Sequence, residues 1–456
     1  MLEKNVVLVK KGAAGKLEKV PIVSQDDNIA LSASMSDQDF NLSSYGVPQS
    51  ICDTMDRAVQ VSVAAGLEAL RDAGIVSGEG EGTQGWVLPE HLQPTTGIVY
   101  ATSFPALDTA ITEVTKFFRT RDVDRLGPAA LVEKLRRKFA EKVSESEVSS
   151  DVEYAFCQLE EAFAQLASSS TSDSSGDGDG PEWSTQAIAI AHDMIQIGRA
   201  ERMIVIAGDN ASSDALMPWL GNGFRALGAA TICPRIKDAA RPFDAMRSGM
   251  ILGSGGIGMV LESEEGARRR HVTALKYGQA HAIKRPAFKC RLLGSLYTNS
   301  AYHGAALDRE HIAEEMERFI ASAEREHSIH RSEIAKYGVY FSHETSTNAS
   351  PTASCASNEL YGLRKVFGED FKNLLILNTK GFTGHPMGVS FEDVVAVEVL
   401  STGRVPAIAN LEHIDPHLGN NVRLSPGGMY PCRYALRFAA GFGSQIAMAL
   451  YGGVDT

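Results

Sequence analysis

Two short stretches decide how this chain folds: YFSHETST at residues 340–347 and NTKGFTGH at residues 378–385. In each case a short apolar run leads into a turn that is rich in small hydroxyl residues. This change is typical of a strand that ends in a loop, where side chains are presented to a pocket. The two stretches therefore predict strand ends that carry His343 and His385, two imidazoles that can together hold an oxyanion.

Around these stretches, apolar runs rich in strand-forming residues alternate with helical patterns. The pattern in the first part of the chain occupies residues 96–102, 187–198, 203–207 and 259–262. After residue 265 it begins again with an apolar run, at residues 272–277, 308–327, 339–341, 374–377 and 394–400. The alternation predicts an α/β fold with mixed sheets covered by helices. Its repetition predicts two similar halves, residues 1–265 and 266–456.

Two segments depart from this alternation. Residues 107–166 are dense in charge and in helix formers, which predicts a helical insertion laid over the core. Residues 168–180 contain only Ser, Thr, Asp and Gly. None of these side chains could fill a core, so the segment predicts a flexible surface loop. Between the halves, residues 262–271 predict a charged surface helix or turn with solvated arginines.

Composition narrows the class of protein. The 456 residues are 44% apolar, enough for one large core or two joined ones. A net charge of −12 argues against a nucleic-acid or anionic-membrane surface, and no apolar run approaches the roughly 20 residues that span a bilayer. The six cysteines form no CxxC pair, which predicts no metal site and no disulfide framework. With no signal pattern in the first residues, we expect a cytoplasmic protein.

The string GSGGIG at residues 253–258 satisfies the GxGxxG pattern of dinucleotide sites. Such a site needs a strand before the glycines and a helix after them. Here an apolar run at residues 259–262 follows, and it predicts a strand. We therefore interpret the glycines as close backbone packing in a turn that leads a strand into the core, and we expect no nucleotide cofactor.

Taken together, these segments resemble the β-ketoacyl synthases, the condensing enzymes of the thiolase-like fold. Residues 241–244 and 247–255 look like the family's RPFDxxRdGfvxGeGa segment, and residues 343–347 and 379–385 look like its HGTST and TKsxxGH motifs. Further similar segments are FRALGA at residues 224–229, NSAYH at 299–303 and GFGS at 441–444. The matches run in order from about residue 184 to 450. The resemblance implies a thiolase-like fold with two similar halves of mixed sheet layered between helices.

The resemblance also implies a chemistry and a site. In the family, a cysteine at a helix N-terminus takes up an acyl group, and a malonyl thioester on an acyl carrier protein then loses carbon dioxide. Two imidazoles stabilise the resulting enolate, here His343 and His385, with Lys380 tuning their charge state. The backbone N–H of Phe442 completes an oxyanion hole. The implied substrate groove contains Thr345, Thr347, Thr383 and His303, and no metal or other cofactor is implied.

The cysteine that serves as the family's nucleophile is missing from the position where the family pattern places it. Its pattern resembles C-A-x-S-x-x-A-I, and residues 184–191 match the helix that follows, with Ser184 as a candidate cap. Counting back from Ala187, the cysteine position falls on Pro181, which has neither a thiol nor an N–H. Cys157 is a poor substitute because it lies in a helical pattern beyond the Ser/Asp/Gly loop. A second departure is the replacement of a small Ala/Gly run by VSFED at residues 389–393, which is expected to narrow or reshape the site.

Three hypotheses stay open. The first is a β-ketoacyl synthase-like acyltransferase of fatty-acid or polyketide biosynthesis that handles acyl and malonyl thioesters on an acyl carrier protein. The lost cysteine opposes full condensation. Malonyl-thioester decarboxylation, which needs the two histidines but not the thiol, is its restricted form. The second is a non-catalytic subunit, like a chain-length factor, that dimerises with an intact synthase. The third is a degenerate or mis-spliced segment at residues 157–183 that leaves a family member inactive or less stable. A homodimer or a heterodimer with a related synthase is expected.

Overall fold

The computed structural model describes residues 7–11, 17–21, 29–35, 40–79, 84–124, 183–279, 282, 286–303, 306–347 and 354–455. The predicted loop at residues 168–180, Pro181, Cys157 and the larger part of the predicted helical insertion lie outside these residues. The part of the insertion that is described forms helix α3 (Leu107–Asp124). The chain divides into two compact units, residues 109–177 and the remainder, residues 1–108 with 178–456.

The larger unit contains two mixed sheets. The first has the order β3-β4-β5, formed by β3 (Thr96–Ala101), β4 (Arg202–Asp209) and β5 (Gly255–Glu262). β3 runs parallel to β4, and β5 runs antiparallel to it. The central strand β4 is buried on both faces, which explains its nearly continuous apolar sequence.

The second sheet has five strands in the order β6-β12-β11-β7-β8. Their bounds are β6 (Arg291–Asn299), β12 (Gln445–Gly452), β11 (Tyr434–Gly441), β7 (Gly338–Phe341) and β8 (Leu375–Leu377). β11, β7 and β8 are parallel neighbours, whereas β12 is antiparallel to both β11 and β6. The largest cluster of buried apolar side chains is built on this sheet.

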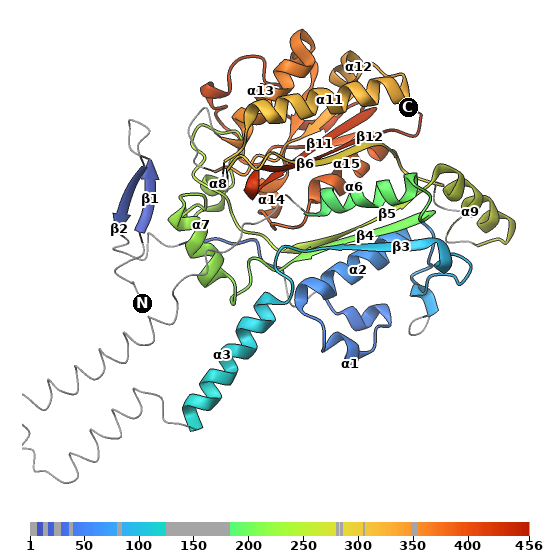
Figure 1. Cartoon of the computed structure of the whole chain (residues 1–456), viewed down its shortest axis with the longest axis horizontal. Helices are drawn as coiled ribbons and strands as arrows, with labels where there is room; N and C mark the ends of the chain where they lie inside the picture. Colours follow the sequence, from blue (N-terminus) through green and yellow to red (C-terminus); the bar gives the residue numbers. More distant parts are fainter. Residues whose placement is uncertain are drawn as a thin grey trace, which may run out of the picture. The chain divides into compact units, whose positions relative to one another are not determined.

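Helices form layers on both sides of each sheet (Figure 1). α6 (Trp183–Gln196) and α15 (Phe391–Thr402) lie between the sheets and contact strands of both. α2 (Arg57–Asp72) packs on the outer side of β4 and β5, and α11 (Arg309–His327) packs on β6 and on α13 (Cys355–Phe367). The predicted α/β fold with mixed sheets between helices is confirmed. Strands of the first sheet come from residues 96–262 and those of the second from residues 291–452, so each predicted half supplies one sheet.

Short elements complete the described chain. The remaining helices are α1 (Gln49–Cys52), α7 (Asn222–Ala226), α8 (Ile236–Ala239), α9 (Glu264–Lys276), α12 (Arg331–Tyr337) and α14 (Lys380–Thr383). Two further antiparallel pairs are formed by β1 (Val7–Lys11) with β2 (Leu17–Pro21) and by β9 (Arg404–Ala407) with β10 (Pro426–Met429). Across the described ranges, every helix is too short or too polar to cross a membrane.

The prediction that the apolar run at residues 272–277 begins the strand pattern of the second half is wrong, because these residues belong mostly to helix α9. Ser263 caps this helix by accepting a hydrogen bond from the Gly266 N–H (3.1 Å). Glu264 pairs with Arg268 four residues later, which also supports a helix. The expectation that all the arginines here are solvated is also wrong, since Arg270 is buried and donates to Glu262.

The glycines at residues 253–258 do lead into a strand, and the packing interpretation is confirmed. β5 begins at Gly255 and pairs with β4. A Cβ on Gly258 would lie 2.2 Å from the carbonyl oxygen of Ala65 in α2, and one on Gly256 would lie 2.6 Å from a methyl of Val61. Only glycine allows β5 to lie this close to α2.

Candidate active site

The two histidine stretches meet because β7 and β8 are parallel neighbours, so their carboxyl ends lie at one edge of the sheet. His343 follows β7 by two residues, and His385 follows β8 after the single turn of α14. The two imidazole rings lie 5.5 Å apart between centroids, with an interplanar angle of 76°. Both side chains are buried. The structure thus brings together the two predicted oxyanion ligands, one from each loop.

Asn378 connects the two loops. Its side-chain amide donates to the carbonyl oxygens of Ser342 (3.1 Å) and Glu344 (2.8 Å), on either side of His343. Its side-chain oxygen accepts a hydrogen bond from the Lys380 N–H (3.0 Å). Asn378 is fully buried, so these bonds are shielded from competing water. One side chain therefore fixes the backbone that carries His343 relative to the backbone that carries Lys380.

The backbone of His385 is hydrogen-bonded to the segment that leads into β5 of the other sheet. Its N–H donates to the Ile251 carbonyl (2.8 Å), and its carbonyl accepts from the Gly253 N–H (3.1 Å). A Cβ on Gly253 would lie 2.6 Å from the Thr383 carbonyl oxygen, and Gly384 has a φ of 67°. Both glycines are therefore required for this close approach. The segment just before β5 positions His385, which gives the GSGG stretch a role at this site.

Both histidines are electrically neutral near pH 7. Burial lowers the pKa of His343 well below its ordinary value of 6.5, and the positive charge of Lys380 lowers it further, against an opposing effect of Glu392. Burial, Lys380 and His343 itself lower the pKa of His385 in the same direction. A neutral imidazole keeps one N–H donor, so each ring can donate one hydrogen bond to an oxygen placed between them.

Lys380 lies in a buried cluster of charges rather than at the surface. Its ammonium is 3.2 Å from the Glu392 carboxylate, which also accepts from the Thr379 hydroxyl (2.8 Å) and lies 3.5 Å from the Arg437 guanidinium. Glu392 is one of the two acids in the VSFED departure. Its side chain binds Lys380 and therefore anchors the cation that adds to the effect of burial on both histidines.

Behind His343 lies a second buried carboxyl group, Glu359 of α13. It accepts hydrogen bonds from the Tyr340 hydroxyl (2.8 Å) and from the His343 backbone N–H (3.0 Å). Burial is the largest cause that raises the pKa of Glu359, to about 8. Near pH 7 this group is therefore mainly protonated. Glu359 holds the backbone of His343 from the side opposite the sheet edge.

The three threonines predicted for the substrate groove do not all lie in the same place. Thr345, Lys380 and His385 line one small cavity of about 10 Å³, the size of a single water molecule. Thr347 lies next to Thr345, with their hydroxyls 3.4 Å apart. The Thr383 hydroxyl instead donates to the Gly384 carbonyl (2.9 Å) and stabilises the turn before His385.

Phe442 and His303 lie near each other on different segments. Phe442 opens the short turn between β11 and β12, at the same sheet edge as the end of β7, and its ring stacks on Phe224 with centroids 6.0 Å apart. Ser444 in the same turn accepts from the His303 N–H (3.1 Å) and donates to the His303 carbonyl (3.0 Å). His303 is exposed, and its Nδ1 accepts a hydrogen bond from the Ala306 N–H (3.1 Å). The structure thus pairs these two predicted residues through Ser444.

The helix that would follow the nucleophile is α6, which begins at Trp183, one residue before the predicted cap Ser184. Ser184 lies in the first turn, where its hydroxyl accepts from the Ser390 N–H (2.5 Å). The next residue, Thr185, donates to the Asp393 carboxylate (2.6 Å). The start of α6 is therefore tied to the loop that follows His385, although Pro181 itself lies outside the described residues.

Cys355 is a thiol near the site that the sequence patterns did not single out. It is the first residue of α13, and its sulfur is 3.8 Å from the Thr345 hydroxyl. Burial, together with the negative charges of Glu344 and Glu359, raises the pKa of this thiol to about 12. A nucleophilic cysteine needs the opposite shift. Cys355 is therefore not a replacement for the nucleophile.

Other supporting residues were also missed by the sequence patterns, namely Asn378, Glu359 and Glu344. Glu344 stands next to His343, and its two carboxylate oxygens accept from the Ser346 N–H (3.0 Å) and the Ala356 N–H (2.9 Å). The only available signal was their position beside or between the two motifs. Within the described part of the chain, no group of three or more His, Cys, Asp or Glu side chains is placed to hold a metal ion.

Comparison with known proteins gives a consistent set of relatives, although no family model matches the chain. It is 27% identical over 420 residues to 3-oxoacyl-[acyl-carrier-protein] synthase 2 of Vibrio harveyi, covering 89% of this chain and 84% of the relative. It is also 27% identical to the putative polyketide beta-ketoacyl synthase 1 of Streptomyces halstedii, covering 91% of this chain and 86% of the relative.

Solved structures with the same fold agree with these relatives. A type II polyketide ketosynthase in complex with its acyl carrier protein superimposes with a TM-score of 0.58 at 22% identity, covering 88% of this chain and 85% of that one. A beta-ketoacyl synthase from Burkholderia phymatum gives a TM-score of 0.57 at 17% identity, covering 89% and 85%. At this identity the likeness concerns the fold alone, and it supports the thiolase-like layers described above.

Proposed function

We propose that this chain, a member of the β-ketoacyl synthase family, decarboxylates malonyl thioesters carried by an acyl carrier protein. The observation that carries the proposal is the pair of buried, neutral imidazoles of His343 and His385, 5.5 Å apart between ring centroids. Chain-length selection and the biosynthetic pathway, fatty acid or polyketide, are not part of the proposal. The family's relatives act in both.

The step needs only groups that this site retains. The bond between the malonyl carboxylate and the α-carbon breaks, carbon dioxide leaves, and the electron pair moves through the α-carbon onto the thioester oxygen. One N–H from His343 and one from His385 donate to that oxygen as its negative charge develops. A proton from water then converts the enolate to an acetyl thioester. Losing one donor to such a developing charge typically costs 10²–10³-fold in rate.

Burial and the charge of Lys380 both favour neutral donors, and Glu392 holds Lys380 in place. If the imidazoles were protonated, the malonyl carboxylate would gain an ion-pairing partner in the ground state, which would oppose its loss. Burial lowers the pKa of both histidines most, and the Lys380 charge lowers it further. The buried Glu392 then offsets the cost of placing Lys380 in a poorly solvated position. We assign these roles by the geometry and by resemblance to the family.

The test uses malonyl-N-acetylcysteamine and malonyl-loaded carrier protein as substrates. Decarboxylation is measured as the release of carbon dioxide and the appearance of acetyl thioester. We expect His343→Ala and His385→Ala each to lower kcat by about 100-fold or more, consistent with the loss of one oxyanion donor. His91→Ala is the matched control, because His91 is exposed and remote from both motifs. Unchanged rates in both site variants would contradict the enolate role.

Carbon–carbon bond formation requires an acyl-enzyme, and we expect none. The protein should remain unmodified in intact-mass spectra after incubation with hexanoyl-N-acetylcysteamine, because the nucleophile position is Pro181 and the pKa of the nearby Cys355 thiol is raised to about 12. A stable mass increase of one acyl group that survives in a Cys355→Ala variant would show that another residue serves as nucleophile.

A partner subunit is the alternative function. We propose that the protein assembles as a homodimer or with an intact synthase in the cytoplasm, and that it meets the carrier protein there. If malonyl decarboxylation is absent from the wild-type chain but a related synthase changes its product length when this chain is added, the chain-length-factor-like role replaces the decarboxylase. The two functions are thus separated by one pair of assays.

A further inference from the structure

A cavity of about 550 Å³ lies at the end of α6 opposite to the histidine pair. α6 begins beside the loop that follows His385, where Ser184 bonds Ser390, and its later residues His192 and Ile195 line the cavity. Eight residues of helix separate Ser184 from His192, a rise of about 12 Å. The cavity is therefore a separate site, and an inference about it goes beyond the proposed function.

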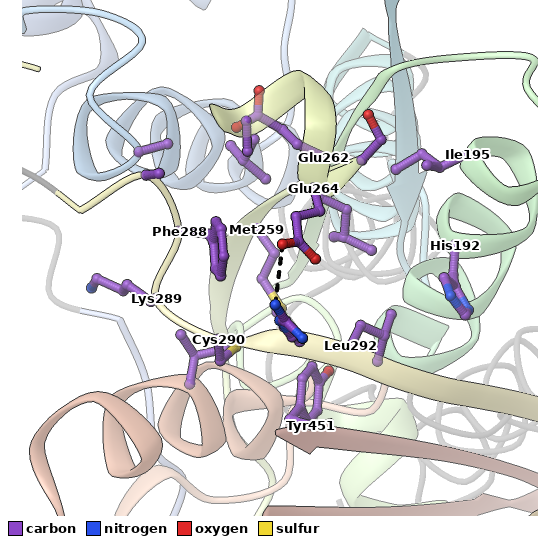
Figure 2. Close-up of a pocket in the computed structure, with 18 of the residues that line it drawn as sticks. His192, Ile195, Met259, Glu262, Glu264, Phe288, Lys289, Cys290, Leu292 and Tyr451 are labelled. Carbon is purple, nitrogen blue, oxygen red and sulfur yellow. Dashed lines mark hydrogen bonds and ion pairs between the residues drawn. The ribbon is translucent and has the colours of Figure 1, made fainter. Parts of the chain in front are cut away.

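Part of the wall of this cavity is apolar. Met259 of β5, Leu292 of β6 and Ile195 of α6 line it (Figure 2). Val397 of α15 also belongs to the lining. Met259 and Leu292 pack against both large core clusters but are themselves only partly buried. Residues at the junction of two cores would normally be fully buried. Their remaining exposed surface lies where the cavity separates the clusters.

Partial burial perturbs two titratable side chains in the wall. Cys290 lines the cavity and has a pKa raised to about 12, mainly by burial. Burial also lowers the pKa of His192. His192 contacts Ser295 through one ring nitrogen (2.9 Å), so it has a partner within the protein. Both shifts have the direction that removal from water causes, which agrees with the apolar part of the wall.

Charged side chains in the wall of the cavity are already paired. Four carboxylates line the cavity, from Asp72, Glu262, Glu264 and Glu398, together with three arginine or lysine side chains, from Arg270, Lys289 and Arg291. Arg270 binds Glu262, Arg291 binds Glu264, and Lys289 binds Asp72 and Glu398. Two arginines outside the lining, Arg202 and Arg268, also bind Glu262 and Glu264. An anionic head group would have to break these pairs to gain a cationic partner.

We propose that this cavity binds an uncharged amphiphile, a molecule with an aliphatic or aromatic body and a neutral polar head. The volume falls within the roughly 300–1,000 Å³ of small-molecule sites. The apolar body lies on Met259, Leu292 and Val397, and the neutral head lies against the charged part of the wall without displacing an ion pair. A fatty acid or an acyl phosphate is disfavoured because its head group would have to break one of these pairs.

The experiment uses Nile red, an uncharged dye whose emission shifts to the blue in apolar surroundings, with the full-length protein. We expect saturable binding of one dye per chain, and displacement by 1-decanol. Decanoate, which has the same chain length and a charged head, should displace the dye at least tenfold less well at pH 7.5. Equal or better displacement by decanoate would overturn the assignment of an uncharged ligand.

A filled cavity provides the structural control. Val397→Trp places an indole in the cavity and should weaken Nile red binding at least tenfold. Leu227→Trp adds the same side chain at a position that is 60% exposed and does not line the cavity, and it should bind like wild type. If circular dichroism shows that Val397→Trp does not fold, Val397→Met is used in its place, with a smaller expected loss. Unchanged binding in the folded cavity variant, or no saturable binding in wild type, would overturn the proposal.

Discussion

Single buried carboxyl groups determine how the histidine pair is held. Glu359 binds the backbone of His343, and Glu392 binds Lys380, which lies close enough to both imidazoles to lower their pKa values. Each acid is almost completely buried, and each interacts with groups from both histidine loops or from the strand beside them. The chemistry of the imidazoles is therefore set by residues that do not face the substrate position themselves.

Glu359 gives the stability of the protein a measurable pH dependence. Its folded pKa is raised to about 8 from an ordinary value of 4.5, so the folded state holds a proton that the unfolded state releases. This contribution to stability is fully present below pH 4.5 and is lost as pH rises toward 8. Glu359→Gln keeps an acceptor oxygen but cannot ionise, and it should flatten the decline in the free energy of unfolding between pH 5.5 and 7.5 by up to about 1.4 kcal/mol per pH unit.

Urea denaturation at several pH values measures this effect. Glu90→Gln, at an exposed position, is the matched control and should retain the wild-type slope. A Glu359→Gln variant with the same pH slope as wild type would show that Glu359 is ionised in the folded protein near neutral pH.

At the scale of secondary structure, the decisive contact is between the start of β5 and the loop that carries His385. Parallel pairing of β7 with β8 brings the two loops to one edge, but the exact place of His385 depends on the Ile251 and Gly253 backbone in the neighbouring layer. α6 and α15 sit between the two sheets and begin at this same point (Figure 1). The elements therefore converge on the site from both sheets.

Gly253→Ala tests this contact. The new methyl group would lie 2.6 Å from the Thr383 carbonyl and 3.0 Å from the His385 N, so the loop must move. We expect a loss of about 1–3 kcal/mol in stability, typical of overpacking, and at least a tenfold loss of malonyl decarboxylation. Gly223→Ala is the control, because a Cβ there meets nothing within 4 Å. Full activity in folded Gly253→Ala would show that the position of His385 does not depend on this approach.

At the scale of the whole molecule, the two predicted halves are joined through buried polar bonds. The Asp209 carboxylate at the end of β4 accepts from the Ser103 N–H (2.9 Å) and from the Gly388 N–H of the second half. Thr185 and Tyr451 both donate to Asp393, which connects α6 with the second sheet. Residues 1–108 and 178–456 accordingly cluster as one compact unit, and the boundary at residue 265 stays a prediction.

These bonds predict that both sheets unfold together. In hydrogen exchange followed by mass spectrometry at increasing urea, peptides from β4 and from β11 should lose protection at the same urea concentration. Loss of β4 protection at a clearly lower concentration than β11 would instead indicate two independently folding halves. A peptide from the exposed strand pair β9 and β10 serves as a reference for local opening, which should occur at lower urea.

The layered α/β fold could be predicted from the sequence, because apolar periodicity records how strands and helices alternate. The short motifs also indicated His343, His385 and Lys380 as site residues and Pro181 as the nucleophile position, and these assignments stay predictions. The packing role of the glycines before β5 is confirmed by their close contacts. The sequence pattern misassigned residues 272–277, where the cap at Ser263 and the charge pairs of α9 outweigh the apolar run.

The surroundings of those residues follow from the tertiary fold. Glu359 bonds His343 across 16 positions of chain, and Asn378 bonds the carbonyls on either side of His343 from a separate loop. In the sequence, Glu392 is visible only as a departure from a family pattern, whereas in the fold it binds Lys380. The cavity beyond α6 is formed by seven separate segments of the chain. Such features arise from which elements pack together and how far their side chains are removed from water, and neither quantity is encoded in local sequence spacing.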